Sequence, residues 1–282
     1  MKKSKIFVYV AACVLVALTL CLAFFLTNDK KKTGRYDIVF FGDSIIACDH
    51  SERDLVTKFN NESEFTVLNG AFGGLTMCLI DKEHLAGNSD NLYTMVGLSQ
   101  AVKERDFSLQ VLASQKGNIN VVPYWHPTSV ELNEVDWDSV KYVLIEHGAN
   151  DYLNGVTIDS TSNKYDPYTF AGALRMSIEN IQASVPNAEI ILVTPIYMNP
   201  WGLMGDCYEA DYGGGFLEDY VEKEIEVASE YNLMVVDNFH ELPINKDNYE
   251  EYIPGGLHGN DAGNELIIQN ILKHIREKNA GN

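Results

Sequence analysis

The sequence predicts an α/β fold in which helices cover both faces of a parallel sheet. Five short apolar runs rich in β-branched residues recur along the chain, and segments with helical spacing separate them. Each run ends at or close to a Gly, Asn, Asp or Thr-Pro. Parallel strands buried on both faces have this continuous apolar character and are joined by helices. In such sheets the active site lies beyond the carboxyl ends of the strands, so the residues after each run are the candidates for function.

The five predicted strands alternate with predicted helices in chain order. The strands are expected at 37–41, 65–68, 140–145, 189–193 and 233–236. The helices are expected at 52–61, 92–115 (one helix or two), 168–184, 217–231 and 265–277. The helix at 168–184, for example, has apolar residues at helical spacing in Leu174, Ile178 and Ile181. The chain contains no internal repeat, so we expect one domain at 35–282.

The composition is that of a folded protein with a strong negative charge. The 282 residues are 46% hydrophobic and 22% charged, and the formal net charge is −19. Nucleic-acid binding requires clustered Lys and Arg, so the acidity argues against a nucleic-acid partner. It also disfavours docking of the domain onto anionic lipid.

The N-terminus differs from the rest of the chain. Residues 6–26 form an uncharged apolar run that follows Lys2, Lys3 and Lys5, and its 21 residues would span about 31 Å as a helix. This length matches the ~30 Å hydrocarbon core and exceeds a signal-peptide core. We therefore expect a cytoplasmic N-terminus at 1–5, a transmembrane signal-anchor at 6–26, a linker at 27–34 and an extracytoplasmic domain. A cleaved signal peptide and a secreted protein are the alternative.

Three cysteines belong to the predicted domain, namely Cys48, Cys78 and Cys207. An odd number cannot form a complete disulfide framework. A bridge between Cys48 and Cys78 remains open, but buried free thiols are the simpler expectation.

Four of the segments that flank the predicted strands carry groups that complement one another. Ser44 follows the first strand in Gly42-Asp43-Ser44, and Gly74 lies in the glycine-rich segment after the second. Asn150 follows the third strand in Gly148-Ala149-Asn150-Asp151, and His258 precedes the last helix in a glycine-flanked loop. Ser44 can attack a carbonyl carbon and His258 can take the hydroxyl proton. Gly74 N–H, Ser44 N–H and the Asn150 amide can stabilise the oxyanion.

The order of these motifs resembles that of the SGNH/GDSL hydrolase superfamily of esterases and lipases. Asn69–Thr76 is similar to its second block, and His258 with Asn260 and Gly263 is similar to its last. The resemblance extends over about 36–275. It implies a three-layer α/β/α flavodoxin-like fold and serine ester hydrolysis that needs no metal or cofactor, with Ser44, His258, Gly74 and Asn150 as the catalytic residues. Asp43 and Asp151 are expected to make structural hydrogen bonds.

One position departs from the family pattern. The family usually has an Asp three residues before the catalytic His, and here that position is Gly255. Such an Asp orients the imidazole and stabilises its protonated form. A backbone carbonyl near Pro254 or Gly255 could orient the ring instead, or the site could be inactive. A carboxylate from another loop could also do so, and the candidates are Asp206, Asp211, Glu241 and Asp261.

The substrate expectation rests on location and on aromatic residues in two segments. The stretch 197–216 and Pro123-Tyr124-Trp125-His126-Pro127 contain Tyr and Trp that could contact sugar rings. We therefore expect hydrolysis of small, acetyl-like acyl esters on cell-surface or other carbohydrate. The alternatives are a carbohydrate O-acyltransferase that uses the same Ser-His site, with a membrane acyltransferase as a partner, and a degenerate glycan-binding protein. The remaining His residues show no metal-ligand spacing and are expected at the surface or in loops.

Overall fold

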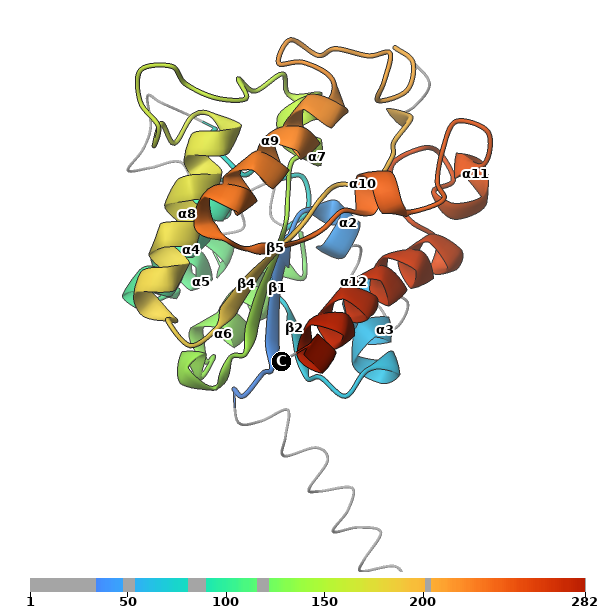
Figure 1. Cartoon of the computed structure of the whole chain (residues 1–282). Coiled ribbons are helices and arrows are strands. Elements are labelled where there is room, and N and C mark those ends of the chain that lie inside the picture. The colour runs from blue at the N-terminus through green and yellow to red at the C-terminus, as the bar shows by residue number, and fades with distance from the viewer. Residues whose placement is uncertain (1–33, 48–53, 81–89, 116–121, 201–203, 282) are drawn as a thin grey trace, which may run out of the picture. The chain divides into compact units, whose positions relative to one another are not determined.

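The protein has a five-stranded sheet in which every strand pair is parallel (Figure 1). The computed structural model describes residues 34–47, 54–80, 90–115, 122–200 and 204–281, and Tyr36–Asn282 forms one compact unit. The strand order is β2-β1-β3-β4-β5. The bounds are Ile38–Gly42 for β1, Val67–Asn69 for β2, Tyr142–Glu146 for β3, Glu189–Val193 for β4 and Met234–Val236 for β5. This result confirms the α/β prediction and places all five predicted strands within two residues of their observed ends.

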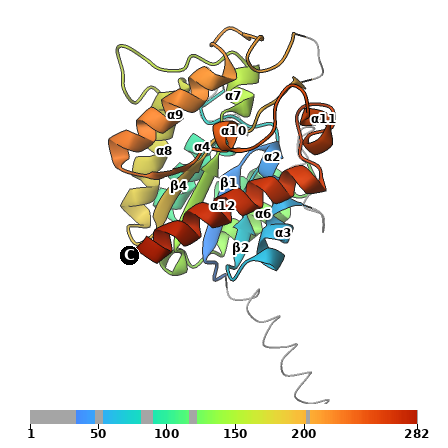
Figure 2. The same cartoon turned by 45° about the vertical axis from the view of Figure 1, so that its right-hand side comes forward.

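Helices cover both faces of the sheet and make three layers (Figures 1 and 2). One face carries α3 (Leu55–Glu62) and α12 (Asp261–Gly281), which pack against each other. The other carries α4 (Met95–Glu104), α6 (Trp125–Asn133) and α8 (Phe170–Ser184), with α5 (Ser108–Gln115) against α6 and α9 (Leu217–Tyr231) beside α8. The short elements are α2 (Ser44–Ala47), η1 (Asp90–Leu92), η2 (Trp137–Ser139), α7 (Ala149–Leu153), α10 (Asn238–Glu241) and α11 (Tyr249–Tyr252).

Two segments differ from the sequence prediction for physical reasons. The predicted helix at 92–115 divides into α4 and α5, because Arg105 adopts a left-handed backbone conformation (φ 53°) that ends α4. Residues 125–133 form α6, which the pattern did not predict. Pro127 lies in the first turn of this helix, where a proline leaves no hydrogen bond unmade.

The expectations for the N-terminus and Cys48 lie outside the described residues. Among the helices that the structure describes, none has both the length and the apolar character to cross a membrane. Residues 6–26 are not among them, so the predicted anchor and the domain boundaries at 1–5, 6–26 and 27–34 remain predictions. Cys78 and Cys207 are buried free thiols, as expected.

Four carboxyl groups are buried, three of them at or just after strand ends and the fourth in α9. Asp43, Glu146, Asp151 and, in α9, Glu224 each have at most 1% of their surface exposed. Burial disfavours the charged form, and it raises the pKa of Asp43 to about 7 and that of Asp151 to about 6. It also raises the pKa values of Glu146 and Glu224 well above the usual range for glutamate. Both carboxyl oxygens of Glu146 lack a hydrogen-bond partner within the described part of the chain.

We predict that Glu146→Gln stabilises the protein, and that the gain grows as pH rises above about 4.5. The unfolded chain ionises Glu146 near its ordinary pKa of 4.5, whereas the folded protein keeps the group protonated to higher pH. Folding therefore takes up a proton in the wild type but not in the variant. The difference in the free energy of unfolding should grow by up to about 1.4 kcal/mol per pH unit, measured by urea denaturation at pH 4 to 8.

Glu179→Gln is the control, and it should behave in the opposite way. Glu179 is exposed, and hydrogen bonds from the hydroxyls of Tyr165 and Tyr231 lower its pKa. This substitution should destabilise the protein at pH 7, and the loss should shrink as pH falls below 4.5. A Glu146→Gln effect that stays constant with pH would contradict the proposed protonation of the buried carboxyl.

Candidate active site

Ser44 lies at the turn between β1 and α2. Glycine is required at Gly42, because a Cβ there would come within 2.7 Å of Ile46 and 3.1 Å of the Glu146 carbonyl oxygen. Asp43 Oδ1 then accepts the backbone N–H of Ile45 at 2.8 Å and fixes the first turn of α2. The sharp turn leaves Ser44, the first residue of α2, at the carboxyl edge of the sheet.

A loop before α12 carries His258 to the same edge. Gly256 has a φ of 79°, and a Cβ at this position would lie 1.9 Å from the carbonyl oxygen of Asn199. Only glycine fits here, and the Asn199 N–H donates to the Gly256 carbonyl at 2.8 Å. At the far end of the loop, Asn260 Oδ1 accepts the N–H of Gly263 at 3.0 Å and caps α12. These contacts fix both ends of the His258 loop.

The side chains of Ser44 and His258 meet. His258 Nε2 lies 2.9 Å from Ser44 Oγ, although the two residues are 214 positions apart in the sequence. His258 is exposed, but partial desolvation of its ring by the surrounding protein atoms lowers the pKa of His258 below its usual 6.5. The neutral imidazole can accept the Ser44 hydroxyl proton at Nε2 when its own proton is on Nδ1.

Within the described residues, nothing accepts a hydrogen bond from His258 Nδ1. Gly255 has a φ of 79°, and no described atom outside Gly255 and its two neighbours in the chain lies within 4 Å of the place where a Cβ would be. Its N–H donates to the Glu250 carboxylate at 3.3 Å. All four candidate carboxylates are engaged with other groups. Asp206 accepts from Tyr197 and Tyr208, Asp211 from Gly213 and Gly215, Glu241 lies 2.7 Å from His274, and Asp261 pairs with Lys58. The described structure thus presents a Ser–His dyad.

The backbone N–H groups of Ser44 and Gly74 make no hydrogen bond in the part of the chain that the structure describes. Gly73 brings this loop close to the nucleophile, since a Cβ on Gly73 would lie 3.3 Å from Ser44 Cβ. The Gly73 N–H itself donates to the Tyr124 hydroxyl at 2.9 Å. Ser44 and Gly74 are therefore the available backbone donors for an oxyanion at this position.

Asn150 lies beside the dyad, but its amide already has partners. Its Nδ2 donates to Asp43 Oδ2 at 2.8 Å and to the Leu75 carbonyl at 3.2 Å, which uses both amide hydrogens. In this arrangement Asn150 connects the turn after β1 to the loop after β2. An oxyanion would have to replace Leu75, the more distant partner, to gain the amide as a third donor.

Several other residues of the predicted site have structural positions. Asp151 accepts the backbone N–H groups of Met77 and Cys78, as expected for a structural carboxylate. Trp125 is buried against Phe72 and Tyr93, so it is a core residue and not a sugar contact.

His147 is buried, contrary to the expectation of a surface or loop position. Burial lowers its pKa to about 3. The sequence signal was present, since His147 directly follows a buried strand. Among the residues that the structure describes, no cluster of three or more His, Cys, Asp or Glu side chains could hold a metal ion.

Comparison with solved structures supports the fold. A possible lipase from Chitinophaga pinensis matches with a TM-score of 0.56 and 17% identity, over 86% of this chain and 99% of that one. A protein from Lactobacillus plantarum matches with a TM-score of 0.58 and 14% identity, over 86% and 97%. The salicylyl-acyltransferase SsfX3 from a tetracycline biosynthetic pathway matches with a TM-score of 0.51 and 11% identity, over 87% and 55%.

No curated protein matches the chain. The family model of the GDSL-like lipases and acylhydrolases matches residues 40–266, which include the end of β1, Ser44, the loop of Gly74, the motif of Asn150 and the loop of His258. This match covers well over half of the sequence and confirms the resemblance seen in the motifs. The chain therefore belongs to the GDSL-like lipase/acylhydrolase family.

Proposed function

We propose that the protein is a serine ester hydrolase that cleaves carboxylic esters with Ser44 and His258. The observation that carries this proposal is the 2.9 Å contact between Ser44 Oγ and His258 Nε2 beside two available backbone donors. Membership of a hydrolase family supports it.

The geometry suits a two-step acyl transfer. His258 Nε2 takes the Ser44 proton as Oγ attacks the carbonyl carbon, and the backbone N–H groups of Ser44 and Gly74 stabilise the oxyanion. His258 then gives that proton to the leaving alcohol oxygen, and an acyl-Ser44 ester remains. Water repeats the sequence in the second step, which releases the acid and restores Ser44.

Compared with a complete triad, the Ser44–His258 dyad of the described structure lacks the carboxylate that accepts a hydrogen bond from the imidazole. The carboxylate of a triad fixes the tautomer of the imidazole, and loss of that role lowers kcat by about 10⁴-fold in a serine protease. Here the fixed ends of the loop limit where the His258 side chain can lie. Partial burial keeps the ring neutral and ready to act as a base. We therefore propose an active enzyme that is slower than a full triad would be.

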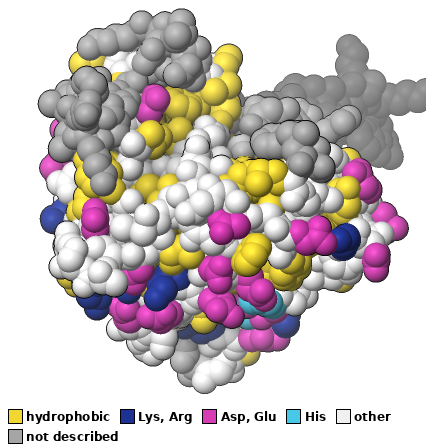
Figure 3. Space-filling view, turned by 90° about the horizontal axis from the view of Figure 1, so that it is seen from above, with side chains coloured by type: hydrophobic (Ala, Val, Ile, Leu, Met, Phe, Trp, Pro, Cys, Tyr) yellow, Lys and Arg dark blue, Asp and Glu magenta, His cyan; other side chains and the backbone are white. Residues whose placement is uncertain are grey.

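For the substrate, we propose small acyl esters on cell-surface or other carbohydrate, with acetyl as the simplest acyl group. The apolar segment at 6–26 supports a membrane-anchored domain outside the cytosol, where acylated glycans occur. Acidic side chains are more widespread than Lys and Arg on the face at the carboxyl edge (Figure 3), which favours a neutral substrate. Tyr208, with 47% of its surface exposed, and Phe216, with 40%, offer aromatic faces in the stretch predicted to contact sugar.

An O-acyltransferase is the second candidate. It would use the same acyl-Ser44 intermediate with a sugar hydroxyl in place of water, and a membrane acyltransferase could supply its acyl groups. The fold it shares with SsfX3, a salicylyl-acyltransferase, favours keeping this alternative. Product analysis in the presence of an acceptor sugar distinguishes the two activities, because only the transferase forms a new ester.

We predict that Ser44→Ala abolishes hydrolysis of short-chain nitrophenyl esters by the purified full-length chain. Without Oγ no acyl-enzyme can form, and kcat/KM should fall by about 10³-fold or more. Ser229→Ala, in the exposed part of α9, is the control and should retain wild-type activity. Equal rates for wild type and Ser44→Ala would exclude the mechanism.

We predict that the midpoint of the acid limb of kcat/KM lies below pH 6.5. Only the neutral imidazole accepts the Ser44 proton, and partial burial lowers the pKa of His258 from 6.5. Activity should fall about tenfold per pH unit below that lowered pKa and level off to a plateau above it. A midpoint near pH 7 would mean that the loss of activity at low pH follows protonation of Asp43 and not of His258, because burial raises the pKa of Asp43 to about 7.

A further inference from the structure

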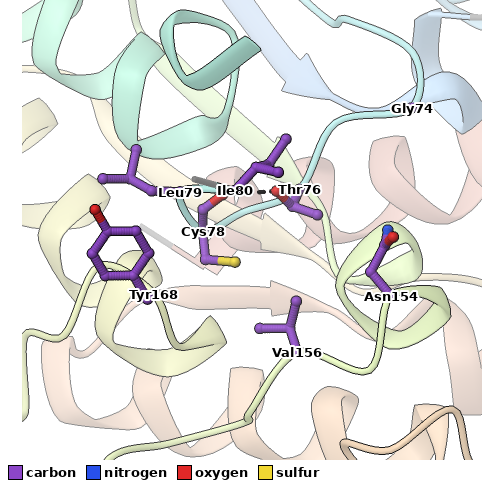
Figure 4. Close-up of a pocket in the computed structure, with 8 residues that line it drawn as sticks. All are labelled: Gly74, Thr76, Cys78, Leu79, Ile80, Asn154, Val156 and Tyr168. Atoms are coloured by element: carbon purple, nitrogen blue, oxygen red, sulfur yellow. Dashed lines mark hydrogen bonds between the residues drawn. The ribbon is translucent and has the colours of Figure 1, made fainter. Parts of the chain in front are cut away.

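A cavity of about 400 Å³ opens beside Gly74. Figure 4 shows that its lining comes from two segments, the loop after β2 and the residues that follow α7. The lining residues are Gly74, Thr76, Cys78, Leu79, Ile80, Asn154, Val156 and Tyr168. The cavity therefore begins at one of the two backbone donors of the proposed oxyanion site.

Hydrogen bonds hold both walls in place. The Asp151 carboxylate accepts the N–H groups of Met77 and Cys78, and the Leu79 N–H donates to the Pro167 carbonyl at 2.9 Å. The Val156 N–H donates to the Asp151 carbonyl at 3.0 Å. A cavity between two fixed walls is preformed, so a ligand would not have to order it on binding.

The described lining suits an apolar group. It contains no charged side chain, and Leu79, Ile80 and Val156 supply aliphatic surface. The polar groups have partners of their own, since the Thr76 hydroxyl donates to the Cys78 carbonyl and the Asn154 amide donates to the Asn150 carbonyl. Burial raises the pKa of the Cys78 thiol, so that the thiol stays neutral.

The position of the cavity relative to the dyad decides which part of an ester it receives. The leaving alcohol oxygen must come within hydrogen-bonding reach of His258 Nε2 to take its proton. The cavity starts at Gly74 on the oxyanion side, and none of its described lining residues belongs to the His258 loop. The acyl substituent of the carbonyl carbon is the part that can enter it.

We propose that this cavity is an acyl subsite, and that it selects an uncharged, apolar acyl group several carbon atoms longer than acetyl. A volume of about 400 Å³ corresponds to roughly thirteen water-sized volumes of ~30 Å³. A two-carbon acetyl group would leave most of the apolar wall without contacts. The inference rests on the proposed ester hydrolysis by Ser44 and His258, and it replaces the acetyl-sized acyl group proposed above with a longer one.

Kinetics on an acyl series test the subsite. With nitrophenyl esters from acetyl to decanoyl, wild-type kcat/KM should rise about two- to fourfold per added methylene until the cavity is full. Val156→Trp, which fills the cavity opposite Cys78, should lower the ratio of kcat/KM for the octanoyl ester to that for the acetyl ester at least tenfold. Ile80→Trp at the half-exposed rim is the second variant, and it should act in the same direction.

The control places the same tryptophan elsewhere. Leu109→Trp lies in α5 at a position that is 59% exposed and does not line the cavity, so the acyl preference should not change. Retained acetyl hydrolysis shows that each variant is folded. A wild-type preference for acetyl over octanoyl, or an unchanged acyl preference in both cavity variants, would overturn the proposal.

Binding of a product analogue separates the subsite from catalysis. Octanamide is neutral, so the net negative charge of the chain does not repel it. Calorimetric titration should show binding to wild type and to Leu109→Trp, and at least tenfold weaker binding to Val156→Trp. Octanamide binding without ester hydrolysis would retain the subsite and reject the proposed function, whereas hydrolysis without octanamide binding would reject the subsite alone.

Discussion

The pairing of β1 with β3 determines where every group of the site lies. Phe41 aligns with Ile145 and Gly42 with Glu146, so the two strands end level with each other at the centre of the sheet. The turns that follow them bring Asp43 and Asn150 into hydrogen-bond contact at 2.8 Å. A shift of one residue in this register would turn the buried strand side chains to the opposite face and separate the two turns. The loop after β2 then brings Gly74, and the loop before α12 brings His258, to the edge of the sheet that this central strand pair has fixed.

The same arrangement places carboxyl groups where water cannot reach them. Asp43 and Asp151 accept backbone and side-chain hydrogen bonds that connect three loops, and these bonds offset part of the cost of burial. The carboxyl oxygens of Glu146 lack such partners within the described part of the chain, and burial raises the pKa of this group well above the usual range for glutamate. Asp43, Asp151 and Glu146 therefore support the site, and the stability of this arrangement depends on their protonation as well as on packing. Gly255, three residues before His258, stands where the family usually has a carboxylate.

Local patterns predicted most of the fold, and contacts between distant residues account for the rest. The five strands have continuous apolar runs of their own, so their positions follow from the sequence. α6 was missed because Pro127 indicates a loop unless the residue is known to occupy the first turn of a helix. The four site residues could be chosen from motif order. Motif order could not show that both hydrogens of the Asn150 amide are engaged, because its partner Asp43 is 107 residues away. The cavity beside Gly74 likewise needs the loop after β2 and the segment after α7 to lie together, which no local pattern specifies.

The central claim is that His258 activates Ser44 without the carboxylate of a catalytic triad. Covalent labelling by a fluorophosphonate tests it most directly, because the probe bonds to an activated serine Oγ and loses fluoride. Mass spectrometry of the full-length chain should locate the adduct on Ser44 in the wild type. The labelling rate should fall by about 10³-fold or more in His258→Ala, and no adduct should form in Ser44→Ala. A folded wild type that is not labelled, or equal labelling rates in wild type and His258→Ala, would contradict the account.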